Sequence, residues 1–122
     1  MKTFLHINNC PIRDILSRLG DKWSLLVLTT LHANGTMRFN DIYRSIGDIS
    51  QRMLTVTLRS LEADGIISRV VYAEVPPRVE YNLTESGENL MFHLNSLVEW
   101  ALKNKENIIE KREQYQNKQE QL

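Results

Sequence analysis

The stretch from Ser50 to Gly65 constrains the fold more than any other part of this 122-residue chain. The hydroxyl of Ser50 can accept a backbone N–H of a first helical turn, and Gly65 suits the left-handed position just past a helix end. Between these signals an apolar residue returns every three or four positions, as on one side of an amphipathic helix. We therefore predict a helix over about residues 50–63. Its expected buried stripe consists of Leu54, Leu58 and Leu61.

The opposite side of this helix carries polar and methyl-bearing side chains. A rotation of about 100° per residue brings together Arg52, Thr55, Val56 and Arg59. Guanidinium forks, hydroxyls and methyl groups are the groups that read base edges and phosphates in a DNA major groove. A solvated helix face explains the same residues, so this pattern alone leaves both interpretations open.

Composition narrows the class of protein. Hydrophobic residues make up 42% and charged residues 25%, which suits one globular domain. No apolar run is long enough to span a bilayer and the first residues lack a secretion signal, so we expect a cytoplasmic protein with no membrane partner. A single cysteine excludes an internal disulfide, and the histidines lack metal-ligand spacing. We predict no metal, no cofactor and no enzymatic activity, because no nucleophile–base pair or phosphate loop is present.

The formal net charge is zero, which argues against nucleic-acid binding because a basic domain is expected for that function. It favours a second hypothesis, a protein–protein interaction module without a DNA partner. In the other direction, every cation between Thr36 and Glu80 is an arginine, the residue best suited to bidentate contacts with phosphate and guanine. The charge distribution therefore does not decide between the two hypotheses.

Two further helices are predicted before Thr36. After an arm over residues 1–9, Pro11 suits a first helical position, and Gly20 ends that helix. Asp21 is the expected N-cap of a helix over about residues 22–32, which is apolar nearly all round and therefore central to the domain.

A short strand is expected next, over Thr36–Phe39, and then a helix over about residues 39–46. A glycine-containing turn joins that helix to the one that begins after Ser50. Two short helices joined in this way predict a helix-turn-helix motif.

After Gly65 the pattern changes to that of strands. Residues 66–72 are rich in β-branched side chains, and residues 79–83 alternate between apolar and polar. The prolines between them stiffen the tip of a hairpin, the wing, spanning about residues 67–83. Arg69 and Arg78 on this hairpin could meet backbone phosphates or the minor groove.

Thr84 is the expected cap of a last helix, whose apolar period runs to Leu102 and continues for a turn or two at Ile108. This helix is too long for the core available to it, so we expect a second copy of the chain as its partner, a homodimer. Residues 113–122 form a polar tail that we expect to be a frayed helix end or disordered. The domain proper is then residues 10–112.

In its order of motifs the chain resembles the HxlR-type winged helix-turn-helix transcriptional regulators of bacteria. The matching segments cover about residues 10–102, and the most specific is Val75–Tyr81. The segments are Cys10-Pro11, Gly20-Asp21-Lys22-Trp23, Arg38–Ile42, Ile49–Leu54, Leu58–Glu62, Asp64-Gly65, Val75–Tyr81, Leu83–Gly87 and Trp100.

The resemblance implies a mainly α fold with a small β-hairpin (α+β) and a long C-terminal dimerisation helix. It also implies a homodimeric regulator, by the family's commoner mode a repressor, that binds double-stranded operator DNA. The second helix of the motif would enter the major groove. The predicted DNA-binding residues are Ser50, Gln51, Arg52, Thr55, Val56, Arg59, Arg38, Arg69 and Arg78.

Cys10 precedes a helix, where partial positive charge lowers the pKa of a thiol. Some members of the resembled family sense oxidants or electrophiles through a cysteine at this place. A small buried hydrophobe is the other interpretation of Cys10, and both stay open. No residue pattern identifies a small-molecule effector.

Overall fold

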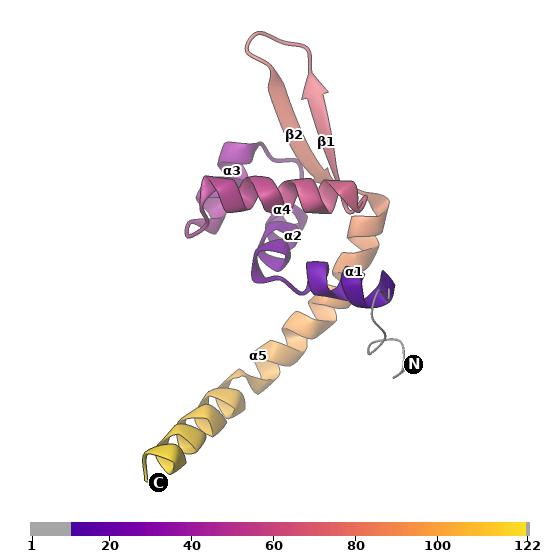
Figure 1. Ribbon diagram of the computed structural model, residues 1–122. Helices are drawn as coiled ribbons and strands as arrows, with labels where there is room; N and C mark the ends of the chain where they lie inside the picture. Colours follow the sequence, from indigo (N-terminus) through magenta and orange to yellow (C-terminus); the bar gives the residue numbers. More distant parts are fainter. Residues whose placement is uncertain (1–10, 122) are drawn as a thin grey trace. The chain divides into compact units, whose positions relative to one another are not determined.

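The structure, a computed structural model, describes residues 11–121. Within these residues four helices are followed by two strands and then by a last, long helix (Figure 1). The described residues form two compact units, a first unit that ends at Met91 and a second unit that begins at Phe92, with the division inside the last helix. In chain order the elements are α1 (Pro11–Leu19), α2 (Lys22–Asn34), α3 (Phe39–Ile46), α4 (Gln51–Ala63), β1 (Ile67–Tyr72), β2 (Arg78–Leu83) and α5 (Glu85–Glu120).

Helix α2 is the centre of the first unit, as predicted. It contacts α1, α3, α4 and β2, and it buries Val27, Leu28 and Leu31. The helix ends at Asn34, slightly later than expected, and Gly35 follows with a φ of 77°. Asp21 occupies the N-cap position, but its side chain makes no capping hydrogen bond, so the expected capping contact is wrong.

The predicted helix-turn-helix is confirmed by α3, a turn at Gly47 with a φ of 88°, and α4. Ser50 Oγ accepts the backbone N–H of Met53 at 3.0 Å, which caps α4 as expected. Gly65, with a φ of 73°, takes the left-handed position after the helix. The predicted apolar stripe is buried: the exposed fractions are 0% for Leu54 and 2% each for Leu58 and Leu61.

The strand expected over Thr36–Phe39 is wrong in extent. Only Met37 pairs, in one isolated antiparallel bridge to Tyr81, with N···O distances of 3.0 and 2.8 Å in the two directions. The segment cannot lengthen into a strand because Phe39 already begins α3.

The hairpin is confirmed, with antiparallel pairing from Ile67↔Leu83 to Tyr72↔Arg78. At its base Ile67, Tyr81 and Leu83 are buried in the core, whereas Val70 and Val71 are exposed farther along. Figure 1 shows the hairpin projecting from the helices of the first unit, with α4 running past its base. The base of the wing is therefore part of the folded core, and the tip is not.

Helix α5 begins where Thr84 Oγ1 accepts the backbone N–H of Gly87 at 3.1 Å, the predicted cap. The helix does not end near Arg112 as expected, but continues through Glu120. The distal residues are mostly glutamine, glutamate, lysine and arginine, which are good helix formers even without a core to cover. None of the described helices is long and apolar enough to cross a membrane.

Candidate nucleic-acid interface

The predicted reading side of α4 faces outward. Gln51, Arg52, Val56 and Arg59 are exposed and Thr55 is half-buried, while the leucines on the opposite side lie in the core. The Thr55 hydroxyl donates to the carbonyl of Gln51 at 2.9 Å, so its proton is already used within the helix. The side chains left with free donors on this side are those of Gln51, Arg52 and Arg59.

An arginine that the sequence did not single out holds the far end of α4. Arg18 of α1 donates from Nη2 and Nε to Ser60 Oγ at 2.9 and 3.2 Å, and its Nη1 lies 3.3 Å from Asp64 Oδ1. This bracket joins residues 42 positions apart in the chain, which no local pattern can predict. It fixes the C-terminal end of α4 against α1. The buried leucines hold the rest of the helix against the core.

Arg38 lies at the N-terminus of α3, where its own backbone N–H donates to Asp41 Oδ2 at 3.3 Å. Its side chain is exposed. The neighbouring Arg44 is different, because its Nη2 is 2.9 Å from Asp41 Oδ1. The predicted residue, Arg38, is thus the one whose guanidinium has no carboxylate partner among the described residues.

At the wing tip Arg78 is enclosed by its own chain. Its guanidinium lies 4.1 Å from the centre of the Tyr72 ring, with Nη1 3.4 Å from Glu74 and Nε 3.7 Å from Glu80. The side chain is 30% exposed, and its buried Nε makes no hydrogen bond. The structure therefore surrounds this predicted DNA contact with two carboxylates and an aromatic face.

The base of the wing meets α4 at a cleft of about 350 Å³. It brings together three predicted site residues, Thr55 and Arg59 of α4 and Arg69 of β1. The remaining lining residues, which the sequence did not single out as site residues, are Phe39, Glu62 and Tyr81. Tyr81 is opposite Arg69 in the hairpin register, so only knowledge of that register could have placed it there.

Apart from Arg13 of α1, the arginines of the first unit fall into two groups by ion pairing. Arg18, Arg44 and Arg78 each have a carboxylate within 4.0 Å. The second group consists of four arginines between α2 and the end of β1, and all four were predicted site residues. Among the residues that the structure describes, no carboxylate lies within 4.0 Å of their guanidiniums. The four are Arg38, Arg52, Arg59 and Arg69. A net charge of zero thus coexists with four guanidiniums available to an outside anion.

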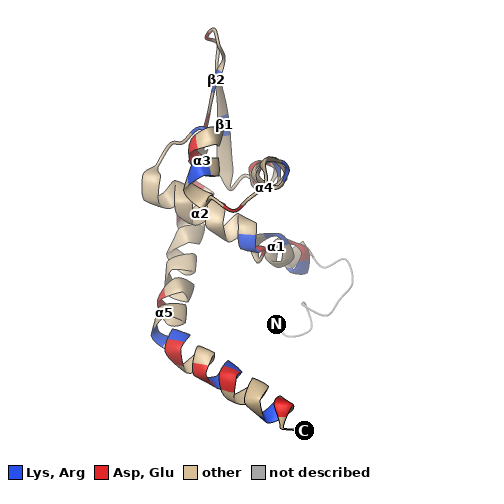
Figure 2. Cartoon of the chain, turned by 90° about the vertical axis from the view of Figure 1, so that its left-hand side faces the viewer, with Lys and Arg blue, Asp and Glu red and all other residues tan. Residues whose placement is uncertain are grey.

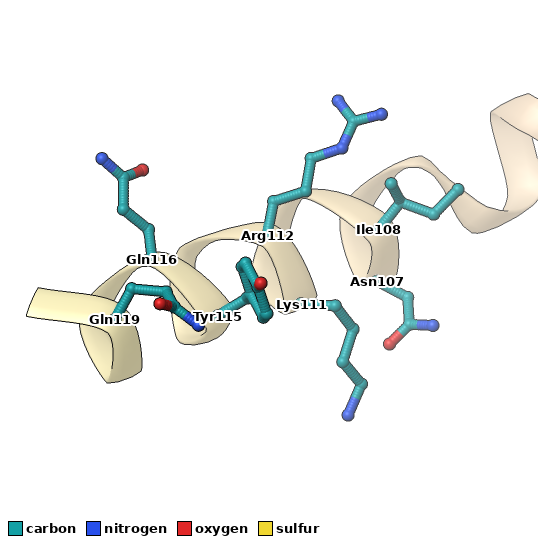
Figure 3. Close-up of a pocket in the computed structure, with 7 residues that line it drawn as sticks. All are labelled: Asn107, Ile108, Lys111, Arg112, Tyr115, Gln116 and Gln119. Atoms are coloured by element: carbon teal, nitrogen blue, oxygen red, sulfur yellow. The ribbon is translucent and has the colours of Figure 1, made fainter. Parts of the chain in front are cut away.

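A second hollow, of about 580 Å³, lies along distal α5 (Figure 3). All of its lining residues belong to this one helix, so no second element closes it into a ligand cavity. Ile108 and Tyr115 line it two helical turns apart, with the stems of Lys111 and Arg112 between them. Figure 2 shows basic and acidic residues alternating along this part of the helix.

The described residues hold no group of three or more histidine, cysteine, aspartate or glutamate side chains that could bind a metal ion. Cys10 lies outside the described residues, as does the arm expected over residues 1–9.

Comparison with known proteins covers most of the chain. The family model of HxlR-like helix-turn-helix proteins matches residues 18–109. An uncharacterized HTH-type transcriptional regulator from Methanothermobacter thermautotrophicus is 51% identical over 92 residues, 75% of this chain and 70% of that protein. The solved structure of the proposed transcriptional regulator ytfH from Salmonella typhimurium has a TM-score of 0.80 at 38% identity, covering 89% of this chain and 96% of that chain. The structure of the redox regulator HypR in its reduced form has a TM-score of 0.71 at 43% identity, covering 78% of this chain and 93% of that chain.

Proposed function

The chain belongs to the HxlR-like helix-turn-helix family of transcriptional regulators, and from that premise we propose that it binds operator DNA sequence-specifically as a homodimeric repressor. Helix α4 would lie in the major groove, and the hairpin would lie over the backbone or the minor groove. The cytoplasm, where DNA is accessible, is its proposed location.

The observation that carries this proposal is the outward side of α4. Three buried leucines hold the helix, and the opposite side presents exposed guanidiniums that no carboxylate of the described residues neutralises. Gln51 and Arg52 lie in the first turn, the part of a recognition helix that contacts base edges. Glutamine suits adenine and arginine suits guanine, so we assign base reading to these two, with Val56 available to a thymine methyl group.

The other predicted residues have supporting roles in this proposal. Arg38 and Arg69 are exposed cations on either side of α4 in the chain, suited to backbone phosphates. Ser50 caps the helix that carries the reading residues. For Arg78 we propose an indirect role, because its intrachain contacts shape the wing tip.

Two exposed apolar surfaces support a homodimer, one in each unit. Helix α1 buries none of its residues, and Ile12, Ile15 and Leu16 are about half exposed. In the second unit α5 exposes large apolar side chains along its length, including Trp100 at 57% and Leu102 at 68%. Surfaces of this kind favour a protein partner, and a second copy is the simplest one.

The test is selection of bound fragments from genomic DNA, followed by a mobility-shift titration of the selected duplex at several salt concentrations. The proposal expects one preferred sequence with twofold symmetry and binding that weakens steeply with salt. Absence of salt-dependent binding to any duplex would instead favour the alternative, a winged-helix module that binds another protein.

Redox responsiveness through Cys10 is a second proposal, favoured by the similarity to a redox regulator. Because Cys10 is the only cysteine, its oxidation can form a disulfide only with a second subunit or with a small thiol. In the first case two thiols lose two protons and two electrons, which diamide accepts. We expect diamide to weaken operator binding, and an identical response of Cys10→Ser would contradict this proposal.

A further inference from the structure

The cleft between α4 and the base of the wing begins on the outward side of α4, away from the first helical turn that carries Gln51 and Arg52. Arg59 reaches it from the same outward side of α4 as Arg52, two turns farther along the helix, and Arg69 reaches it from β1. Both elements are fixed here by buried residues, Leu58 and Leu61 on α4 and Ile67 on β1. The two guanidiniums are therefore carried by rigid supports.

The charges of the cleft do not cancel. Arg59 and Arg69 have no carboxylate within 4.0 Å among the described residues, although Glu62 also lines the cleft. Two cations and one anion leave a net charge of one positive unit. A phosphodiester of DNA carries one negative unit and has oxygens that accept the paired N–H groups of guanidinium.

The other residues that line the cleft shape it but offer few hydrogen-bond donors. Tyr81 is only 8% exposed and Phe39 is half-buried, so their rings form fixed walls. The Thr55 hydroxyl already donates to Gln51. The strongest donors left in the cleft are those of the two arginines, whose paired N–H groups match the oxygens of a phosphate.

We propose that this cleft seats one backbone phosphate of bound DNA, held jointly by Arg59 and Arg69. In this arrangement Arg59 fixes the depth and register of α4, and sequence is read by Gln51 and Arg52 at the other end of the helix. The inference rests on the proposed function, and it divides the predicted contacts into reading and positioning residues.

The first test compares the parent with Arg59→Gln, Arg69→Gln and the double variant, on the selected operator and on a duplex of unrelated sequence. Each single variant is expected to bind both duplexes about tenfold more weakly, with an unchanged ratio between them. Because the two arginines share one phosphate, the double variant is expected to reduce the slope of log K against log salt by about 0.9, the value for a single phosphate. Two separate phosphates would reduce it by about 1.8.

Two control variants fix the interpretation. Arg44→Gln removes an exposed arginine that is already paired with Asp41, and it is expected to change neither affinity nor slope. Glu62→Gln removes the acid of the cleft and is expected to strengthen binding to both duplexes alike. Circular dichroism melts of all variants check that the fold is kept.

The second test uses operator duplexes in which single linkages are replaced by neutral methylphosphonates. In each half-site, replacement of one particular linkage is expected to lower the operator affinity of the parent. The same replacement is expected to leave the affinity of the double variant unchanged. A changed operator preference in Arg59→Gln, a slope reduction near 1.8, or the absence of such a linkage would overturn this inference alone. A parent protein that binds no duplex would overturn the proposed function and this inference with it.

Discussion

The outward side of α4 and the tip of the wing both carry arginine, but their arginines are in opposite electrostatic situations. On α4, Arg52 and Arg59 are exposed and have no carboxylate within 4.0 Å among the described residues. At the tip, Arg78 lies over Tyr72 between Glu74 and Glu80. A cation in a binding motif therefore contributes its charge to a partner only when its own chain has not already neutralised it.

The largest effect is expected from removing the support of the outward side of α4. Leu58 is 2% exposed, so Leu58→Ala should lower the free energy of unfolding by about 2–5 kcal/mol through lost burial and a residual cavity. Urea denaturation measures the change. The matched control is Val56→Ala on the opposite side, where the side chain is 52% exposed and a change within about 0.5 kcal/mol is expected. Equal losses for both variants would contradict the assignment of inner and outer sides.

The next largest effect concerns the reading residue. Arg52→Ala should cost about 1–3 kcal/mol at the operator and relax the preference at one base position. Fluorescence anisotropy on a set of singly substituted operators measures both quantities. If the variant binds and discriminates as the parent does, the reading role of this side of α4 is wrong.

A smaller effect is expected at the wing tip. Arg78→Ala should weaken operator binding by less than about 1 kcal/mol and leave the salt slope unchanged, because the guanidinium already faces two carboxylates. Hydrogen exchange should increase at the wing tip, since the contact with Tyr72 is lost. A slope reduction of about 0.9 would show instead that Arg78 binds a phosphate.

The carboxylates at the wing tip can be removed in place of the arginine. Replacing Glu74 and Glu80 together by glutamine should release Arg78 from its carboxylate partners and make it resemble the arginines of α4. Binding to specific and unrelated duplexes should then strengthen alike, with a steeper salt dependence. A double variant whose binding and salt dependence match those of the parent would contradict this account of the tip.

Arg18→Ala is expected to lower stability far less than Leu58→Ala does. The ion pair with Asp64 is partly exposed, with 40% and 27% of the two side chains accessible, so its loss should cost about 0.5–1 kcal/mol of stability. Thermal melts in low salt measure this loss, and high salt should reduce the difference between variant and parent. A difference that grows with salt would show that the bracket does not act through charge.

Local signals in the sequence were sufficient for most of the fold. The Ser50 cap, the left-handed Gly65 and the leucine period of α4 each act within a few residues, and all three are confirmed. The same holds for the prolines of the hairpin connection and the cap at Thr84. Distal α5 was underestimated because its residues lack an apolar period although they favour helix.

The candidate site was less predictable because its contacts join distant segments. The positions of the arginines followed from helix and strand periodicity, but which of them are paired did not. The partners of Arg78 depend on the register of the hairpin tip, and the Arg18 bracket joins α1 to α4. The walls that Phe39 and Tyr81 give the cleft likewise depend on how α3 and the hairpin pack beside α4.

The most direct measurement of the central claim is a crystal structure of the protein bound to its selected operator. We predict two copies of the chain on one duplex, each with Gln51 and Arg52 against base edges in a major groove and Val56 facing the same groove. A structure in which this side of α4 is instead buried in the contact between the two copies would contradict it.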